Sequence, residues 1–203
     1  MTSDVDRLAH LSRDVETTLI DWLPKGVGQH VPESPAYCVF LWYHDFSMDD
    51  AALSFGIGTT EFRDACVGRL KRSATEAIWT PQQMIDEPFP GFPFPGGNCD
   101  VVSAEVNEMY ALMSAPYFEQ LEKGETDEDG EKELNALAPL RHALHRVGLS
   151  LNKLAEWKEI LPVTDDFIVF PTDFIGSWQC EDFEAAVPEE RHQRLARQPW
   201  HPC

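Results

Sequence analysis

An unbroken apolar and aromatic run at residues 36–43, Ala-Tyr-Cys-Val-Phe-Leu-Trp-Tyr, constrains the fold of this chain more than any other stretch. It begins after Pro35 and ends at His44, so its length is that of a strand. β-branched and aromatic side chains suit a pleated surface, and the absence of polar alternation indicates that both faces are covered. The run therefore predicts a buried central strand.

A second strand is predicted at residues 52–58, where Leu53, Phe55 and Ile57 alternate with small residues. The polar stretch 44–50 lies between the two runs, so we expect them to form a central antiparallel hairpin. The apolar run at 167–170 is expected to join the same sheet, and a further strand is predicted at 75–80.

Helices should cover this sheet, because several segments carry apolar residues at helical spacing. Pro24 is expected to end the first of these helices and Gly148 to cap the fourth. The predicted helices span residues 4–23, 60–72, 102–121 and 134–147. The fold class expected is α+β, with a mainly antiparallel sheet.

The length of 203 residues fits one globular domain over 1–203. A Pro/Phe-rich loop is expected at 86–97, strapped over the core because its phenylalanines would be costly to leave in water. An acidic loop is expected at 122–133, in solvent. This loop begins like a calcium-binding loop, but the twelfth position from Glu125 is Ala136 instead of Glu, and whether it binds a cation is left open.

The net charge of −19 disfavours nucleic-acid binding, which needs a basic surface. Such a charge steers basic proteins toward the chain, although it also serves solubility alone. No apolar stretch reaches the roughly 18 residues of a membrane span, and the acidic amino terminus lacks the features of a signal peptide. We therefore expect a cytoplasmic protein that acts neither on nucleic acid nor in a membrane. Its oligomeric state is not indicated.

No metal or cofactor is expected. The five cysteines are scattered, without a CxxC spacing, and Cys38 is expected in the core rather than as a reactive thiol. His142 and His145 lie three residues apart on a predicted helix, but nothing supplies further ligands. Both are expected on the polar face near the helix end.

Catalytic motifs are also missing, since no serine stands in a Gly-x-Ser-x-Gly elbow. The best acid-base candidates are His44 and Asp45, at the end of the central strand. The alternative is a surface turn, because adjacent residues seldom point the same way.

Three short segments resemble a bacterial family known as domain of unknown function 4303. They are the strand Tyr37 to Tyr43, the Gly58-Thr59-Thr60-Glu61 helix start, and Trp79-Thr80-Pro81. The resemblance covers roughly residues 30–85, and the second tryptophan usual in the family is replaced by Gln82-Gln83-Met84-Ile85. It implies a small α+β protein, and similar acidic families include immunity proteins that neutralise toxins.

The function expected is a non-catalytic binding module, of immunity or adaptor type, that captures a basic protein. Its aromatic anchors would lie beside acidic residues, as tight interfaces require. The residues predicted for this interface are Trp79, Asp165, Asp166, Asp173 and Trp178. The alternative is a small hydrolase-like enzyme with a site near His44 and Asp165/Asp166.

Overall fold

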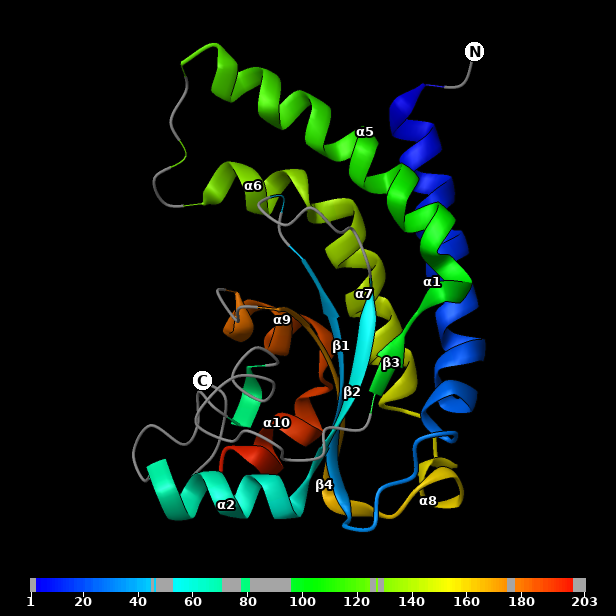
Figure 1. The fold of residues 1–203 in the computed structure, drawn as a ribbon, viewed down its shortest axis with the longest axis vertical. Helices are drawn as coiled ribbons and strands as arrows, with labels where there is room; N and C mark the ends of the chain where they lie inside the picture. Colours follow the sequence, from blue (N-terminus) through cyan, green and yellow to red (C-terminus); the bar gives the residue numbers. More distant parts are fainter. Residues whose placement is uncertain are drawn as a thin grey trace.

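A computed structural model describes residues 3–44, 46, 53–70, 78–80, 96–124, 127, 130–174 and 178–198, and every structural statement below concerns these residues. The fold is α+β, as predicted. In chain order the elements are α1 (Asp4–Val27), β1 (Ala36–Tyr43), β2 (Ser54–Thr59), α2 (Thr60–Leu70), β3 (Gly96–Asn98), the 3₁₀ turn η2 (Asp100–Val102), α5 (Ser103–Glu122), α6 (Glu131–Ala136), α7 (Ala138–Leu151), α8 (Trp157–Ile160), β4 (Val163–Asp173), α9 (Gln179–Ala186) and α10 (Glu189–Leu195) (Figure 1). Within the described ranges, no helix combines the length and apolar composition that crossing a lipid bilayer requires.

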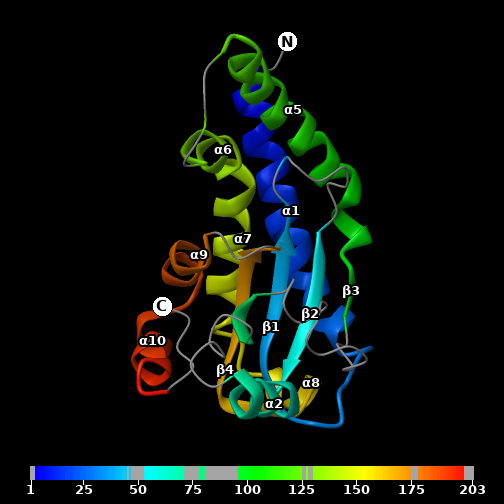
Figure 2. The same ribbon diagram turned by 60° about the vertical axis from the view of Figure 1, so that its left-hand side comes forward.

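The four strands form one mixed sheet in the order β3-β2-β1-β4 (Figure 2). β1 and β2 pair antiparallel as predicted, with Val39 opposite Ile57, and β2 and β3 also pair antiparallel. The pairing of β1 with β4 is parallel, so the sheet is not purely antiparallel. A parallel pair requires a long crossover, which the helices between β2 and β4 supply.

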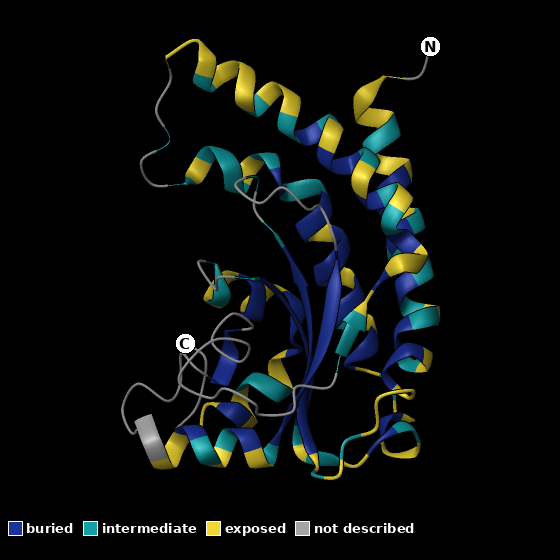
Figure 3. Cartoon of the chain, in the orientation of Figure 1, coloured by how far each residue is buried: buried dark blue, intermediate teal, exposed yellow. Residues whose placement is uncertain are grey.

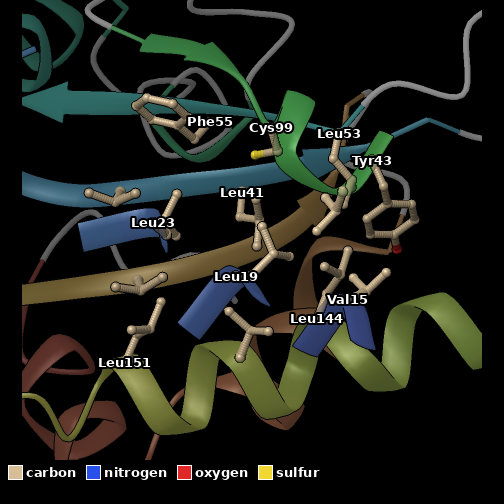
Figure 4. Packing of buried hydrophobic residues seen from close by; sticks show 14 of the residues in the cluster. Val15, Leu19, Leu23, Leu41, Tyr43, Leu53, Phe55, Cys99, Leu144 and Leu151 are labelled. Atoms are coloured by element: carbon tan, nitrogen blue, oxygen red, sulfur yellow. The ribbon is translucent and has the colours of Figure 1, made fainter. Parts of the chain in front are cut away.

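Strand β1 is buried along its whole length, because a hydrophobic cluster covers each face of the sheet (Figure 3). On one face Val39 and Leu41 belong to a cluster with buried side chains of α1, α5 and α7. Figure 4 shows Leu41 together with Leu19 of α1 and Leu144 of α7. On the other face Trp79 packs against Phe40 and Phe170. The predicted central strand is therefore confirmed.

A break in the alternation of β1 occurs near its start. The register shifts between Ala36 and Cys38, and as a result Tyr37 and Cys38 both belong to the Trp79 cluster. Cys38 is fully buried, and burial raises the pKa of its thiol well above the ordinary value. The prediction that it is a core residue is confirmed.

Helix α1 begins as predicted but ends later. Ser3 accepts a hydrogen bond from the backbone N–H of Asp6 at 3.2 Å, which caps the first turn. Pro24 does not end the helix, since its carbonyl accepts the N–H of Gly28 at 3.1 Å. Leu23 and Val27 are fully buried on either side of it, so packing of the last turn offsets the missing amide hydrogen of the proline.

The predicted strand at 75–80 is not formed in its described part, because Ile78 and Trp79 are helical. The next strand is instead β3, a glycine-rich segment. A Cβ atom on Gly96 would lie 2.3 Å from the carbonyl oxygen of Phe55, so only glycine permits this close pairing with β2. Residues 86–95 of the predicted strap lie outside the described residues.

Gly148 is not the cap predicted at the end of its helix, because α7 continues to Leu151. A Cβ atom at this position would lie 2.9 Å from both the Ala186 side chain and the Pro171 ring. The glycine therefore serves close packing of α7 against α9 and β4.

Candidate functional site

The carboxyl ends of the parallel strands β1 and β4 meet where Tyr43 lies opposite Asp173. Such strand ends are a common position for ligand and catalytic sites in sheets with parallel strands. α7 and α9 lie beside them (Figure 1). Four polar side chains from these elements form what we call the strand-end cluster, composed of Tyr43, Arg141, His145 and Asp182.

Asp182 on α9 is the centre of the strand-end cluster and is fully buried. Its Oδ1 accepts hydrogen bonds from Nη2 of Arg141 at 2.7 Å and from Nε at 3.1 Å, and lies 2.7 Å from Nε2 of His145. Its Oδ2 accepts the hydroxyl of Tyr43 at 2.9 Å, and that hydroxyl in turn accepts Nε of Arg141 at 2.8 Å. One carboxylate thus joins α7, α9 and β1.

The pKa of the Tyr43 phenol is raised well above its ordinary value. The main cause is burial, and the second is the negative charge of Asp182. For Arg141, burial by itself would lower the pKa, but Tyr43 and Asp182 outweigh it and the net pKa is raised. The cluster therefore holds a protonated phenol and a permanent guanidinium cation around one anion. Exposed His142 has a lowered pKa, because partial burial and the charges of His145 and Arg141 disfavour its cationic form.

This arrangement suits a structural role better than a catalytic one. The phenol of Tyr43 is kept protonated, and both oxygens of Asp182 are already bonded inside the protein. A general base needs an oxygen or nitrogen that can reach a substrate, and a fully buried carboxylate offers none. Among the residues that the structure describes, no group of three or more His, Cys, Asp or Glu is placed to hold a metal ion.

Three of the predicted site residues lie near the strand-end cluster. The His44 ring lies 5.0 Å from that of Phe174, which follows β4. Asp173 accepts the backbone N–H of Trp178 at 3.1 Å, and the indole of Trp178 lies 5.3 Å from the guanidinium carbon of Arg141. Asp45 lies outside the described residues.

The remaining predicted residues lie elsewhere. Asp165 and Asp166 are near the start of β4, roughly 25 Å from its end at the usual rise per residue. The carboxylate of Asp166 faces Arg63 at 3.7 Å. Trp79 is fully buried in the core. The structure therefore brings together neither the five residues of the predicted interface nor His44 with Asp165 and Asp166.

Sequence reasoning assigned none of the four members of the strand-end cluster to a site. His145 was expected on a polar helix face, but it is buried and bonded to Asp182. A usable signal was present, because Arg141 and His145 are four apart and fall on the same stripe as Leu144 and Leu140. An arginine and a histidine within an apolar stripe require a buried polar partner, although nothing in the sequence identifies Asp182 as that partner.

A second candidate site is an open groove lined by residues of α1, α5 and α6. α5 and α6 extend past the sheet beside the start of α1 (Figure 1). We call this site the α5–α6 groove. Its volume is about 420 Å³, and its lining is mainly apolar. Met113 is buried, whereas Leu8, Leu112 and Tyr117 are partly exposed. The polar members of the lining are Gln120, Lys132 and Asn135.

Acidic residues of α5 and α6 lie near this groove. Among the residues that the structure describes, Glu119 and Glu122 are close to the lining residue Gln120 on α5, and Glu131 and Glu133 flank the lining residue Lys132 on α6. Asp127 stabilises the start of α6, since its carboxylate accepts the backbone N–H groups of Lys132 and Glu133, both at 2.9 Å. These bonds and the Lys132 charge lower the pKa of Asp127 despite the opposing effect of desolvation. The start of α6 therefore carries a fixed negative charge.

Comparisons of the chain with protein-family models, with curated proteins and with solved structures return no match. The resemblance noted at residues 37–81 consequently stays a prediction.

Proposed function

We propose that this chain is a non-catalytic, cytoplasmic binding module, of immunity or adaptor type, that captures a basic protein partner. The observation that supports the proposal is the α5–α6 groove, whose mainly apolar lining lies beside the described acidic residues Glu119, Glu122, Glu131 and Glu133 of α5 and α6. The interface proposed here is therefore a different surface from the one predicted from the sequence.

The apolar lining suits one face of an amphipathic helix. Leu8 and Leu112 are only partly buried, so the free protein leaves apolar area in water that a partner would cover. A methionine beneath them adapts to side chains of differing shape. Grooves between helices commonly bind a helix through apolar anchors at positions i, i+3, i+4 and i+7.

The charges along the groove determine which helix binds best. Glu119, Glu122 and Glu131 are exposed on α5 and α6 and would face the polar side of a bound helix. Lysine and arginine at those positions are attracted, whereas an acidic helix is repelled. The occupant is therefore a basic amphipathic helix of a partner protein.

Binding can be tested with a labelled synthetic peptide of about 18 residues, helical in length, with leucines on one face and lysines and arginines on the other. Fluorescence anisotropy should show saturable binding that weakens as salt rises above about 0.1 M. A scrambled peptide of the same composition keeps the charge but loses the apolar face. It should bind at least about tenfold more weakly.

Matched variants locate the site. Leu112→Ser in the groove should weaken binding about tenfold, whereas Val67→Ser, at an exposed apolar residue of α2, should not. Glu122→Gln with Glu131→Gln should weaken it about two- to fivefold relative to Glu184→Gln on α9. Equal binding of the scrambled peptide, or equal affinity of the two serine variants, would overturn the proposal.

A further inference from the structure

A basic pocket lies at the amino-terminal end of β4, far from both the strand-end cluster and the α5–α6 groove. It has a volume of about 200 Å³ and lies between the start of β4, α8 and α10. We call it the β4 pocket. Its charged and hydroxyl-bearing residues are Lys158, Thr164, Asp165, Arg191 and Arg194.

The arginines of this pocket are not paired with any carboxylate that the structure describes. Neither Arg191 nor Arg194 forms an ion pair with a carboxylate of the described residues, although the chain has 35 acidic and 16 basic residues. Arg191 donates from Nη1 to the carbonyl of Phe167, which fixes its position and leaves other N–H donors. Burial and the charge of Arg194 lower the pKa of Arg191, while Glu190 opposes them.

A hydroxyl group in the same lining also lacks a partner. Oγ1 of Thr164 is buried, and no donor or acceptor of the described chain bonds to it. A buried hydroxyl without a partner is unfavourable, and a ligand oxygen would relieve this. Together, the guanidinium groups of Arg191 and Arg194, the Lys158 ammonium and the Thr164 hydroxyl provide the donors that a phosphate group accepts.

The rest of the lining is apolar. The rings of Trp157 and Phe167 pack with centroids 5.2 Å apart and belong to the pocket wall. The volume is several times the roughly 30 Å³ that one water takes in the liquid, so there is room for more than a bare ion. Asp165 is the opposing charge, but its side chain is fully exposed and lies 3.5 Å from Nζ of Lys158.

We propose that the β4 pocket binds the phosphate group of a small phosphomonoester, with Arg191, Arg194, Lys158 and Thr164 as donors and the Trp157 and Phe167 rings beside its organic part. This site is independent of the groove proposed above. It is occupied by an anion, whereas the groove attracts cations, so the two proposals can fail separately.

Isothermal titration calorimetry of the full chain with phenyl phosphate, and separately with inorganic phosphate, tests this site. Phenyl phosphate should bind at concentrations below about 10 mM and at least about threefold more tightly than inorganic phosphate, because its ring reaches the apolar wall. Lack of saturable binding by phenyl phosphate would overturn the proposal. Equal affinity for the two probes would overturn the assignment of the Trp157 and Phe167 rings to the organic part of the ligand.

Four variants separate site binding from general charge effects. Arg194→Gln should weaken phenyl phosphate binding about tenfold, and Thr164→Val about threefold. Asp165→Asn removes the opposing carboxylate and should tighten binding about twofold. Arg197→Gln makes the same charge change on an exposed residue outside the pocket and should leave affinity unchanged. Equal losses in the Arg194 and Arg197 variants would show only nonspecific attraction and overturn the proposal.

Discussion

The two ends of strand β4 differ in whether their charged side chains are paired within the protein. At the carboxyl end, the carboxylate of Asp182 is fully buried and each of its oxygens is bonded within the protein. At the amino end, Arg191 and Arg194 line an open pocket without a carboxylate partner among the described residues. A charged group that is buried and paired within the protein contributes to the stability of the fold. An accessible charged group without a protein partner can instead bind a ligand.

This difference has a direct energetic consequence. Removing one partner of a buried, bonded charge pair leaves the other charge in a poor solvent, which strongly destabilises the fold. Removing a partly exposed, unpaired charge leaves nothing uncompensated. Substitutions at the two ends should therefore differ in their effect on unfolding far more than their similar chemistry suggests.

The largest effect is expected for Asp182→Ala. This variant leaves Arg141 buried without its anion, so the free energy of unfolding should fall by about 3–5 kcal/mol in urea denaturation. Glu181→Ala changes the exposed neighbour on the same helix and should stay within about 0.5 kcal/mol of the native protein. Similar values for the two variants would show that the strand-end cluster does not hold α9 in place.

A smaller loss is expected for Tyr43→Phe, which removes one hydroxyl and keeps the ring. That hydroxyl donates to Asp182 and accepts from Arg141, so its removal should cost about 1–3 kcal/mol in the same measurement. Because the ring of Tyr43 is fully buried, the phenylalanine fills the same space. An unchanged urea midpoint in Tyr43→Phe would contradict the hydrogen bonds described for the strand-end cluster.

The strands of the two central pairs could be predicted from sequence because their signal is local. Residues 36–43 and 167–170 carry apolar runs, and burial on both faces follows from the absence of polar residues within them. The observed strand β4 extends beyond the second run, to Val163–Asp173. The parallel pairing of β1 with β4 could not be predicted, because it depends on the path of the helices between them. β3 escaped prediction because glycines at 96 and 97 are typical of a loop, whereas here they permit close pairing with β2.

The strand-end cluster was out of reach for a different reason. Its residues lie at positions 43, 141, 145 and 182, and only the fold brings them together. Asp182 follows Glu181 and precedes Glu184, so its surroundings in the sequence indicate a solvated acidic helix. His44 and Trp178 follow β1 and β4, and Asp173 ends β4, so these predicted site residues lie at one strand end. Asp165, which the sequence reasoning grouped with them, lies near the opposite end of β4.

A pH dependence should accompany the carboxyl end of β4. The folded-state pKa of His142 is lowered by partial burial, His145 and Arg141, so it lies below the unfolded value of about 6.5. The unfolded chain then binds more protons in this interval, and the stability present above about pH 6.5 is lost as the pH falls through the folded pKa. His142→Gln should flatten the dependence of the thermal midpoint on pH between about 7 and 5, and an unchanged slope in this variant would contradict the lowered pKa of His142.

The smallest effect on stability belongs to the amino end of β4. Arg194 is exposed and unpaired among the described residues, and its charge disfavours the cationic form of Arg191. Arg194→Gln should therefore leave the free energy of unfolding within about 0.5 kcal/mol of the native value, with any change toward greater stability. The matching change at the carboxyl end, Arg141→Gln, removes a guanidinium bonded to Asp182 and should cost about 3 kcal/mol or more. Comparable losses for the two variants in parallel urea denaturations would mean that Arg194 supports the fold, and the contrast between the two ends of β4 would then be lost.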